Sequence, residues 1–227
     1  VFERAIDYPC AIADQTDGGM GLALNWLLEQ KKDYEELTLW VPLKPTLRNN
    51  DFLIQLARYE GRGLKIIAKD EVHCANGPVL AMYSDVENLA YVTAAAGISA
   101  LAVVQWADRL ETWTKEVNAE VLHQLDPNDD LPNYVDGPEP ELVAEVVEGL
   151  EHITQVINHS NTIAATGYEK DITVRTLLGL HDRGFRLSAK RMAEWAIAHG
   201  WRHDNPKELI KWVKKINRGT RPRTSRS

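Results

Sequence analysis

The chain has 227 residues, of which 44% are hydrophobic and 26% are charged, and its formal net charge is −7. This composition is ordinary for a globular protein, and the length favours two compact units of about 100 to 130 residues. It has no uncharged apolar run of about 18 residues and no cationic, apolar secretion signal at its start, so we expect a cytoplasmic protein without a membrane-spanning helix.

Residues 1–124 alternate short apolar runs with amphipathic windows, which predicts a Rossmann-like α/β domain with a mainly parallel sheet of about five strands. The strands are expected near residues 9–13, 37–41, 64–68, 79–83 and 100–105. Four helices connect and follow them. The third is predicted to begin at the capping box Ser84-Asp85-Val86-Glu87 and to end at Gly97, and the fourth to cover residues 107–124.

Residues 125–140 contain four prolines and no periodicity, which is typical of a linker between domains. Residues 141–227 are predicted to form a helical domain, with helices near 142–157, 171–183, 188–199 and 206–218. Gly184, Gly200 and Gly219 follow three of these helices and are expected to end them.

Ligands of open α/β sheets bind beyond the carboxyl ends of the strands, so the loops there are the candidate sites. Three glycines precede the first helix: Gly18, Gly19 and Gly21. A glycine-rich turn at a helix start presents backbone N–H groups to a phosphate. In the alternative interpretation, the glycines only form the turn and Asp17 caps the helix, because neither a dinucleotide fingerprint nor a P-loop is complete.

Four aspartates follow predicted strands and are expected to converge at the same sheet edge: Asp14, Asp17, Asp70 and Asp85. Such carboxylates are the ligands that Mg²⁺ prefers, which predicts a metal-dependent phosphoesterase or nuclease. In the alternative interpretation, Asp85 serves only the helix start. The seven histidines are not expected to form a zinc site.

The strongest charge asymmetry is at the C-terminus, where residues 205–227 hold eight of the 26 cations and a single acid, Glu208. Four apolar residues fall at i, i+3, i+4 and i+7 and predict a buried stripe: Leu209, Trp212, Val213 and Ile216. The cations predicted to face outward, or to continue the series in the tail, are Lys207, Lys211, Lys214, Lys215, Arg218, Arg221 and Arg223.

A basic helix face with a basic tail is typical of contact with nucleic acid or with an acidic protein partner. Two alternatives stay open. Cations at a helix C-terminus are favoured by its dipole in any case. The acidic residues between 126 and 151 also offer internal pairing, or pairing across a homodimer, which would make the protein a structural adaptor.

The stretch MAEWAIAHGW, residues 192–201, resembles the "Trp-Ala, three residues, Gly" pattern in the DNA-binding domains of actinobacterial nucleoid-associated proteins. That family places an Arg-Gly-Arg loop soon afterwards, whereas this chain has Arg202-His203-Asp204-Asn205. The whole order, α/β followed by a helical tail with tryptophans, is similar to uncharacterised actinobacterial α/β-plus-helical proteins. The resemblance implies the fold and carries no mechanism.

Overall fold

The structure is a computed structural model of the full chain. It describes residues 6–69, 71, 74–106, 109–123, 139–157, 163, 167–202 and 204–224. The chain divides into two compact units, Asp7–Asn133 and Tyr134–Ser227 with Val1–Ile6. Ile6 groups with the second unit, where its N–H donates to the carbonyl of Ala198 at 3.2 Å.

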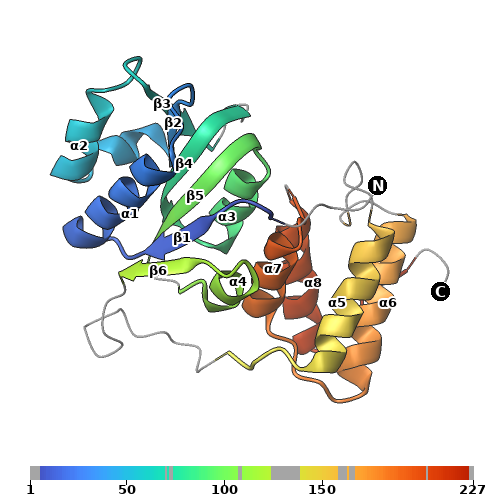
Figure 1. Ribbon diagram of the computed structural model, residues 1–227. Helices are drawn as coiled ribbons and strands as arrows, with labels where there is room; N and C mark the ends of the chain where they lie inside the picture. The colour runs from blue at the N-terminus through green and yellow to red at the C-terminus, as the bar shows by residue number, and fades with distance from the viewer. Residues whose placement is uncertain are drawn as a thin grey trace. The chain divides into compact units, whose positions relative to one another are not determined.

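The first unit contains a six-stranded sheet in the order β3-β2-β4-β5-β1-β6, in which every neighbouring pair is parallel (Figure 1). The strands are β1 (Cys10–Ala13), β2 (Leu37–Val41), β3 (Leu64–Ala68), β4 (Cys74–Ser84), β5 (Ala96–Gln105) and β6 (Glu120–His123). The connecting helices are α1 (Asp17–Gln30), η1 (Lys44–Arg48), α2 (Asp51–Ala57), α3 (Val86–Thr93) and α4 (Glu111–Glu116). Because β1 lies next to β6 near one edge, this order differs from the 3-2-1-4-5-6 order of the Rossmann fold.

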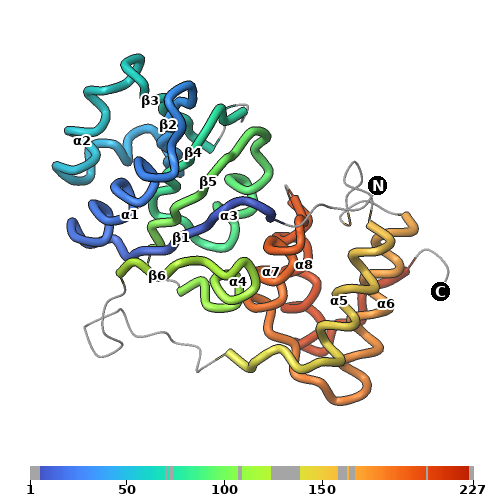
Figure 2. Tube along the Cα trace, in the orientation of Figure 1, coloured from blue at the N-terminus to red at the C-terminus, as the bar shows by residue number. Residues whose placement is uncertain are grey.

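Helices cover both faces of this sheet. The connections from β1 to β2 and from β2 to β3 run one way along the sheet, whereas those from β4 to β5 and from β5 to β6 run the other way. Since parallel crossovers are right-handed, α1 and α2 cover one face and α3 and α4 belong to the other, and Figure 2 shows α1 and α3 on opposite sides. The β1 and β5 strands are therefore neighbours whose following helices lie on opposite faces.

All five predicted strands are confirmed, and β2 and β3 have the predicted bounds. Two predictions in this unit are wrong. The fourth helix stops at Glu116, because Asn118 takes a left-handed conformation (φ 51°) and the chain continues as the strand β6. The third helix is capped by Asp85 and not by Ser84, which is the last residue of β4. It ends at Thr93, and Gly97 is already the second residue of the next strand, β5.

The second unit contains four helices in its described residues: α5 (Ala144–Val156), α6 (Tyr168–Asp182), α7 (Ala189–Ala198) and α8 (Asn205–Asn217). Their apolar faces pack into one core, which includes the fully buried Leu150, Leu177, Met192 and Trp201. Gly184, Gly200 and Gly219 have φ values of 88°, 90° and 79°, which confirms them as helix ends. No helix in the described residues is long and apolar enough to cross a bilayer.

Candidate functional sites

The first candidate site lies where β1 and β6 end. The carboxyl ends of parallel strands meet at one edge of a sheet, and Ala13 of β1 pairs with His123 of β6. Asp14 follows Ala13, and its N–H donates to the carbonyl of His123 at 3.1 Å. The backbone of the two strands thus holds an aspartate beside a histidine that is 109 positions later in the chain.

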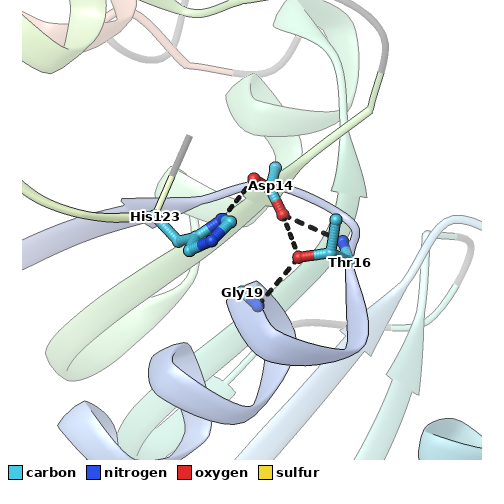
Figure 3. A network of polar contacts seen from close by, with 4 residues as sticks. All are labelled: Asp14, Thr16, Gly19 and His123. Carbon is cyan, nitrogen blue, oxygen red and sulfur yellow. Dashed lines mark hydrogen bonds and ion pairs between the residues drawn. The ribbon is translucent and has the colours of Figure 1, made fainter. Parts of the chain in front are cut away.

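The side chains of Asp14 and His123 are in direct contact, with 2.6 Å between Asp14 Oδ2 and His123 Nδ1 (Figure 3). The carboxylate is buried, with 7% of its side chain exposed, whereas 42% of the His123 side chain is exposed. An aspartate that accepts from Nδ1–H fixes the imidazole in one tautomer. The other ring nitrogen, Nε2, is then left with a lone pair.

The second oxygen of Asp14 is held by the loop that enters α1. Its Oδ1 accepts from the backbone N–H of Thr16 at 2.9 Å and from the Thr16 hydroxyl at 2.5 Å. Thr16 is also the N-cap of α1, since its hydroxyl oxygen accepts from the N–H of Gly19 at 3.0 Å (Figure 3). Burial alone would raise the pKa of Asp14, but the hydrogen bonds from Thr16 and His123 outweigh it and lower that pKa below its usual value.

The three glycines predicted to hold a phosphate lie in the first turns of α1. Gly19 is tightly enclosed, because a Cβ there would lie 2.5 Å from Asp14 Oδ1 and 2.6 Å from the Asp14 carbonyl oxygen. Its N–H is already taken by Thr16. A Cβ added at Gly18 would have one neighbouring atom within 4 Å, and a Cβ added at Gly21 would have none. Gly19 therefore serves the close approach of Asp14, and the N–H at this position is not available to a phosphate.

The four aspartates predicted to share a metal have different surroundings. Asp14 belongs to the pair with His123, and Asp17 is an exposed first residue of α1. Asp85 accepts from the N–H of Asn88 at 2.7 Å as the N-cap of α3. Asp70 lies outside the described residues. Within the described ranges, no three His, Cys, Asp or Glu residues come together in a way that would hold a metal ion.

A second group of side chains lies at the ends of β4 and β5. Tyr83 has a left-handed backbone (φ 53°), which is rare for an aromatic residue, and its hydroxyl lies 2.5 Å from Asn50 Nδ2. Burial, and after it the negative charge of Asp17, raise the pKa of Tyr83. The ring of Trp106, a 51% exposed residue, packs edge-on against Tyr83 with 5.0 Å between ring centroids.

Two hollows adjoin the sheet, at opposite ends of its strands. The larger, of about 600 Å³, is lined by Cys10 and Glu120 at the amino ends of β1 and β6, and its lining does not include His123. The smaller, of about 200 Å³, is lined by Gln105 and Arg109 at the carboxyl end of β5. Only the smaller hollow lies at the end of the sheet where α/β proteins bind ligands.

The second candidate site is the outer face of α8 in the helical unit. The predicted apolar stripe is confirmed, since Leu209, Trp212, Val213 and Ile216 are at most 9% exposed. This burial turns the opposite face of the helix outward. We call four exposed cations on that face the α8 basic surface: Lys207, Lys211, Lys214 and Arg218.

The cations of this region differ in their partners. Lys211 contacts the carboxylate of Glu208 at 3.0 Å, and the half-buried Lys215 lies over the Trp212 ring with its Nζ 4.8 Å from the centroid. Lys214 and Arg218 are exposed and form no ion pair or hydrogen bond with side chains of the described residues. Among the described residues, Lys214 and Arg218 are therefore exposed cations of α8 that no carboxylate balances, and Lys215 is a third, half-buried one.

The residues after α8 do not simply extend the basic series. Nη1 and Nη2 of the Arg221 guanidinium donate to the Asp182 carboxylate at the end of α6, at 2.8 and 2.7 Å. Asn217 Nδ2 donates to the carbonyl of Leu187 at 2.8 Å. Arg223 is exposed and has no described partner. The tail is thus tied to α6 by Arg221, and the cation of that residue is already balanced.

The acidic residues between 126 and 151 are the predicted alternative partners of these cations. Residues 126–138 of that region lie outside the described part of the chain. Glu139 accepts a hydrogen bond from Ser188, the N-cap of α7, and Glu145, Glu148 and Glu151 are exposed on α5. None of these four glutamates pairs with Lys214 or Arg218.

Sequence reasoning assigned no role to His123 or Thr16. The spacing of Leu110, Trp113, Val117 and Val121 continued a helical stripe through this segment, so His123 was placed inside a helix. The available signal was the short run Glu120-Val121-Leu122-His123 directly before the proline-rich linker, which also suits an edge strand.

In a comparison with family models, a domain of unknown function (DUF1889) matches residues 144–227. Comparisons with curated proteins and with solved structures give no match. The matched region runs from the first residue of α5 through α8, so it coincides with the helices of the second unit and contains the α8 basic surface. The sheet and the pair formed by Asp14 and His123 lie outside it.

Proposed function

We propose that this protein binds nucleic acid through the α8 basic surface and that it does so in the cytoplasm. Lys214 and Arg218 carry the proposal, because both are exposed and neither has a carboxylate partner among the described residues. Exposed cations that no carboxylate neutralises are free to replace the counterions condensed on a phosphate backbone.

The geometry of the surface suits a row of phosphates. Lys207 and Arg218 are eleven residues apart, which corresponds to about 16 Å along a helix. One strand of duplex DNA carries a phosphate for about every 3.4 Å of its axis, so the row is long enough for roughly four contacts. The buried Trp212 holds the row in place, because the indole is 9% exposed and fixes the rotation of α8 about its axis.

The contact is assigned to α8 and not to the segment after α7. Nucleoid-associated proteins, which the MAEWAIAHGW stretch resembles, insert an Arg-Gly-Arg loop into DNA at that point. This chain has Arg202-His203-Asp204-Asn205 there, and Asn205 is buried, with its side chain accepting from the N–H of Ile163 at 3.1 Å. The basic face of the next helix offers the larger number of exposed cations.

The test is a titration of fluorescently labelled duplex DNA with the full chain at 50 and 200 mM salt. Four phosphate contacts predict an affinity that falls about 150-fold between these salt concentrations. The double variant Lys214→Glu, Arg218→Glu should bind DNA more weakly than the unchanged protein at both salt concentrations. Because about two phosphate contacts are left, its affinity should fall only about 12-fold between 50 and 200 mM salt. The fluorescence anisotropy of the labelled DNA gives the affinity at each salt concentration.

The matched control is Lys32→Glu, Arg62→Glu, which makes the same change in net charge at two exposed residues of the α/β unit. It should leave the affinity and the salt dependence close to those of the unchanged protein. Absence of binding at 50 mM salt would remove nucleic acid as the ligand, and an acidic protein would become the better candidate for this surface. An equal loss of affinity for DNA in the two double variants would show that the contact with DNA is not at α8.

A further inference from the structure

The pair formed by Asp14 and His123 has the geometry of an acid–base centre. The carboxylate is buried and held by Thr16 on one oxygen, and the other oxygen is 2.6 Å from Nδ1 of a ring that is partly exposed. A carboxylate in this position orients an imidazole and stabilises the cation that forms when Nε2 takes up a proton.

The pair lies at the point of the sheet where ligands bind in open α/β folds. The β1 and β5 strands are neighbours whose following helices belong to opposite faces, and open α/β sheets bind ligands beyond the carboxyl ends of such a pair. Val104 pairs with Ala13, which places Gln105 level with Asp14 at about 5 Å, the spacing of neighbouring strands. Gln105 lines the hollow of about 200 Å³ at this edge.

We propose that His123 is a general base, oriented by Asp14, for the attack of water or a hydroxyl group on an uncharged ester-type substrate bound beyond β1 and β5. In this step the O–H bond of the nucleophile breaks and its proton forms a bond to Nε2. The oxygen attacks the carbonyl carbon, the bond to the leaving alcohol breaks, and the proton on Nε2 returns to the leaving oxygen. Beside β1 the charges are negative, from Asp14 and the exposed Asp17, which favours an uncharged reacting group there, whereas the Arg109 guanidinium lines the hollow at the end of β5.

The structure predicts the effect of Asp14→Asn on the ring. Oδ1 of Asp14 accepts two hydrogen bonds from Thr16, so an asparagine at this position keeps its carbonyl oxygen there. Its amide NH₂ then faces His123 Nδ1 and donates to it. The ring must respond by carrying its proton on Nε2, and the lone pair that the reaction needs is lost.

The first measurement is the tautomer of His123 in the ¹⁵N-labelled full chain, by long-range proton–nitrogen correlation at a pH where the ring is neutral. We expect the proton on Nδ1 in the unchanged protein and on Nε2 in Asp14→Asn. The resonance is assigned with His123→Gln, which alters an exposed side chain on an edge strand. The same tautomer in both proteins would overturn the proposal, whereas loss of the fold is detected by the dispersion of the remaining signals.

The second measurement is the release of p-nitrophenolate from p-nitrophenyl acetate, a neutral ester, and from p-nitrophenyl phosphate, an anion. We expect release from the acetate only, and a fall of at least tenfold in both Asp14→Asn and His123→Gln. His152→Gln is the control, because His152 is an exposed histidine of α5 without a described partner. Release that persists in His123→Gln, or that is absent from the unchanged protein, would refute the general-base role.

Neither measurement depends on nucleic acid, so the two proposals fail separately. Charge reversal at Lys214 and Arg218 should leave the His123 tautomer and the ester hydrolysis unchanged, since those residues belong to the other unit. Asp14→Asn should in turn leave the affinity for DNA unchanged.

Discussion

The tight loop around Asp14 can be tested with two glycine substitutions in one helix. In Gly19→Ala the new methyl group would lie 2.5 Å from Asp14 Oδ1, 2.6 Å from the Asp14 carbonyl oxygen and 3.2 Å from the Thr16 hydroxyl. The carboxylate can turn, but the carbonyl oxygen belongs to the backbone at the end of β1 and cannot move without disturbing the sheet. Gly21→Ala is the matched control, because a methyl group there meets no atom within 4 Å.

The magnitude follows from two opposing effects. Both substitutions replace glycine by alanine in α1, which stabilises a helix by about 0.5 to 1 kcal/mol. Only Gly19→Ala creates an overpacked contact, and such contacts typically cost about 1 to 3 kcal/mol. The free energy of unfolding of the two variants should therefore differ by about 1 to 3 kcal/mol, with Gly21→Ala the more stable and, on its own, slightly more stable than the unchanged protein.

The assay is urea denaturation of the full-length variants, followed by circular dichroism, with thermal melting as a second measurement. For a chain of this size each 1 kcal/mol corresponds to about 2 to 4 °C in melting temperature. If Gly19→Ala were as stable as Gly21→Ala, the loop would not enclose Asp14 as described. The carboxylate of Asp14 would then not be held toward His123 by a closely packed loop.

Two further predictions concern single side chains. Burial raises the pKa of Cys10 to about 12, whereas Cys74 is exposed. Iodoacetamide at pH 8 should therefore label only Cys74 in the native protein and both thiols in urea, and mass spectrometry would show which thiols are labelled. The hydrogen bond from Arg221 lowers the pKa of Asp182. The stability that this pair contributes is therefore fully present above the usual carboxyl pKa, and it is lost as the pH falls through the lowered pKa of Asp182. In Arg221→Gln, an NMR titration of Asp182 should give a pKa that has returned toward its usual value, and an unchanged pKa would contradict the contact.

Periodicity predicted the layers of this fold well because most of its elements have one buried face. The stripe Leu209, Trp212, Val213 and Ile216 is an example: one helical face is buried, and the sequence pattern is the direct record of that burial. The strands β2 and β3 were also placed at their observed bounds, since each is a short apolar run with turn residues on both sides.

The strand β6 was missed for a physical reason. It is an edge strand with a single neighbour, and Glu120, Val121 and His123 are exposed, so no alternation marks it. The signal that ends the preceding helix is Asn118 in a left-handed conformation, which asparagine tolerates better than most residues but which no local pattern requires.

The pair formed by Asp14 and His123 could not be found from local pattern at all. The two residues are brought together by strand order, because β6 returns beside β1 after the chain has formed four other strands. Hydrophobic periodicity determines which residues are buried, but it contains no information about which strands become neighbours. Sequence reasoning therefore reached Asp14, as a residue at a strand end, and not its partner.

An acidic protein that binds a polyanion through one helix needs a physical explanation, because the net charge of −7 opposes the approach of DNA. At about 0.15 M ionic strength the Debye length is about 8 Å, so charges farther from a phosphate than this contribute little. Lys214 and Arg218 would contact a phosphate within that range, so their local attraction outweighs the net charge of the whole chain. At lower salt the distant carboxylates are screened less and their repulsion increases along with the attraction. The observed salt slope should then be shallower below about 50 mM than above it, and a slope that stayed constant down to about 10 mM would mean that carboxylates outside α8 have no effect on binding.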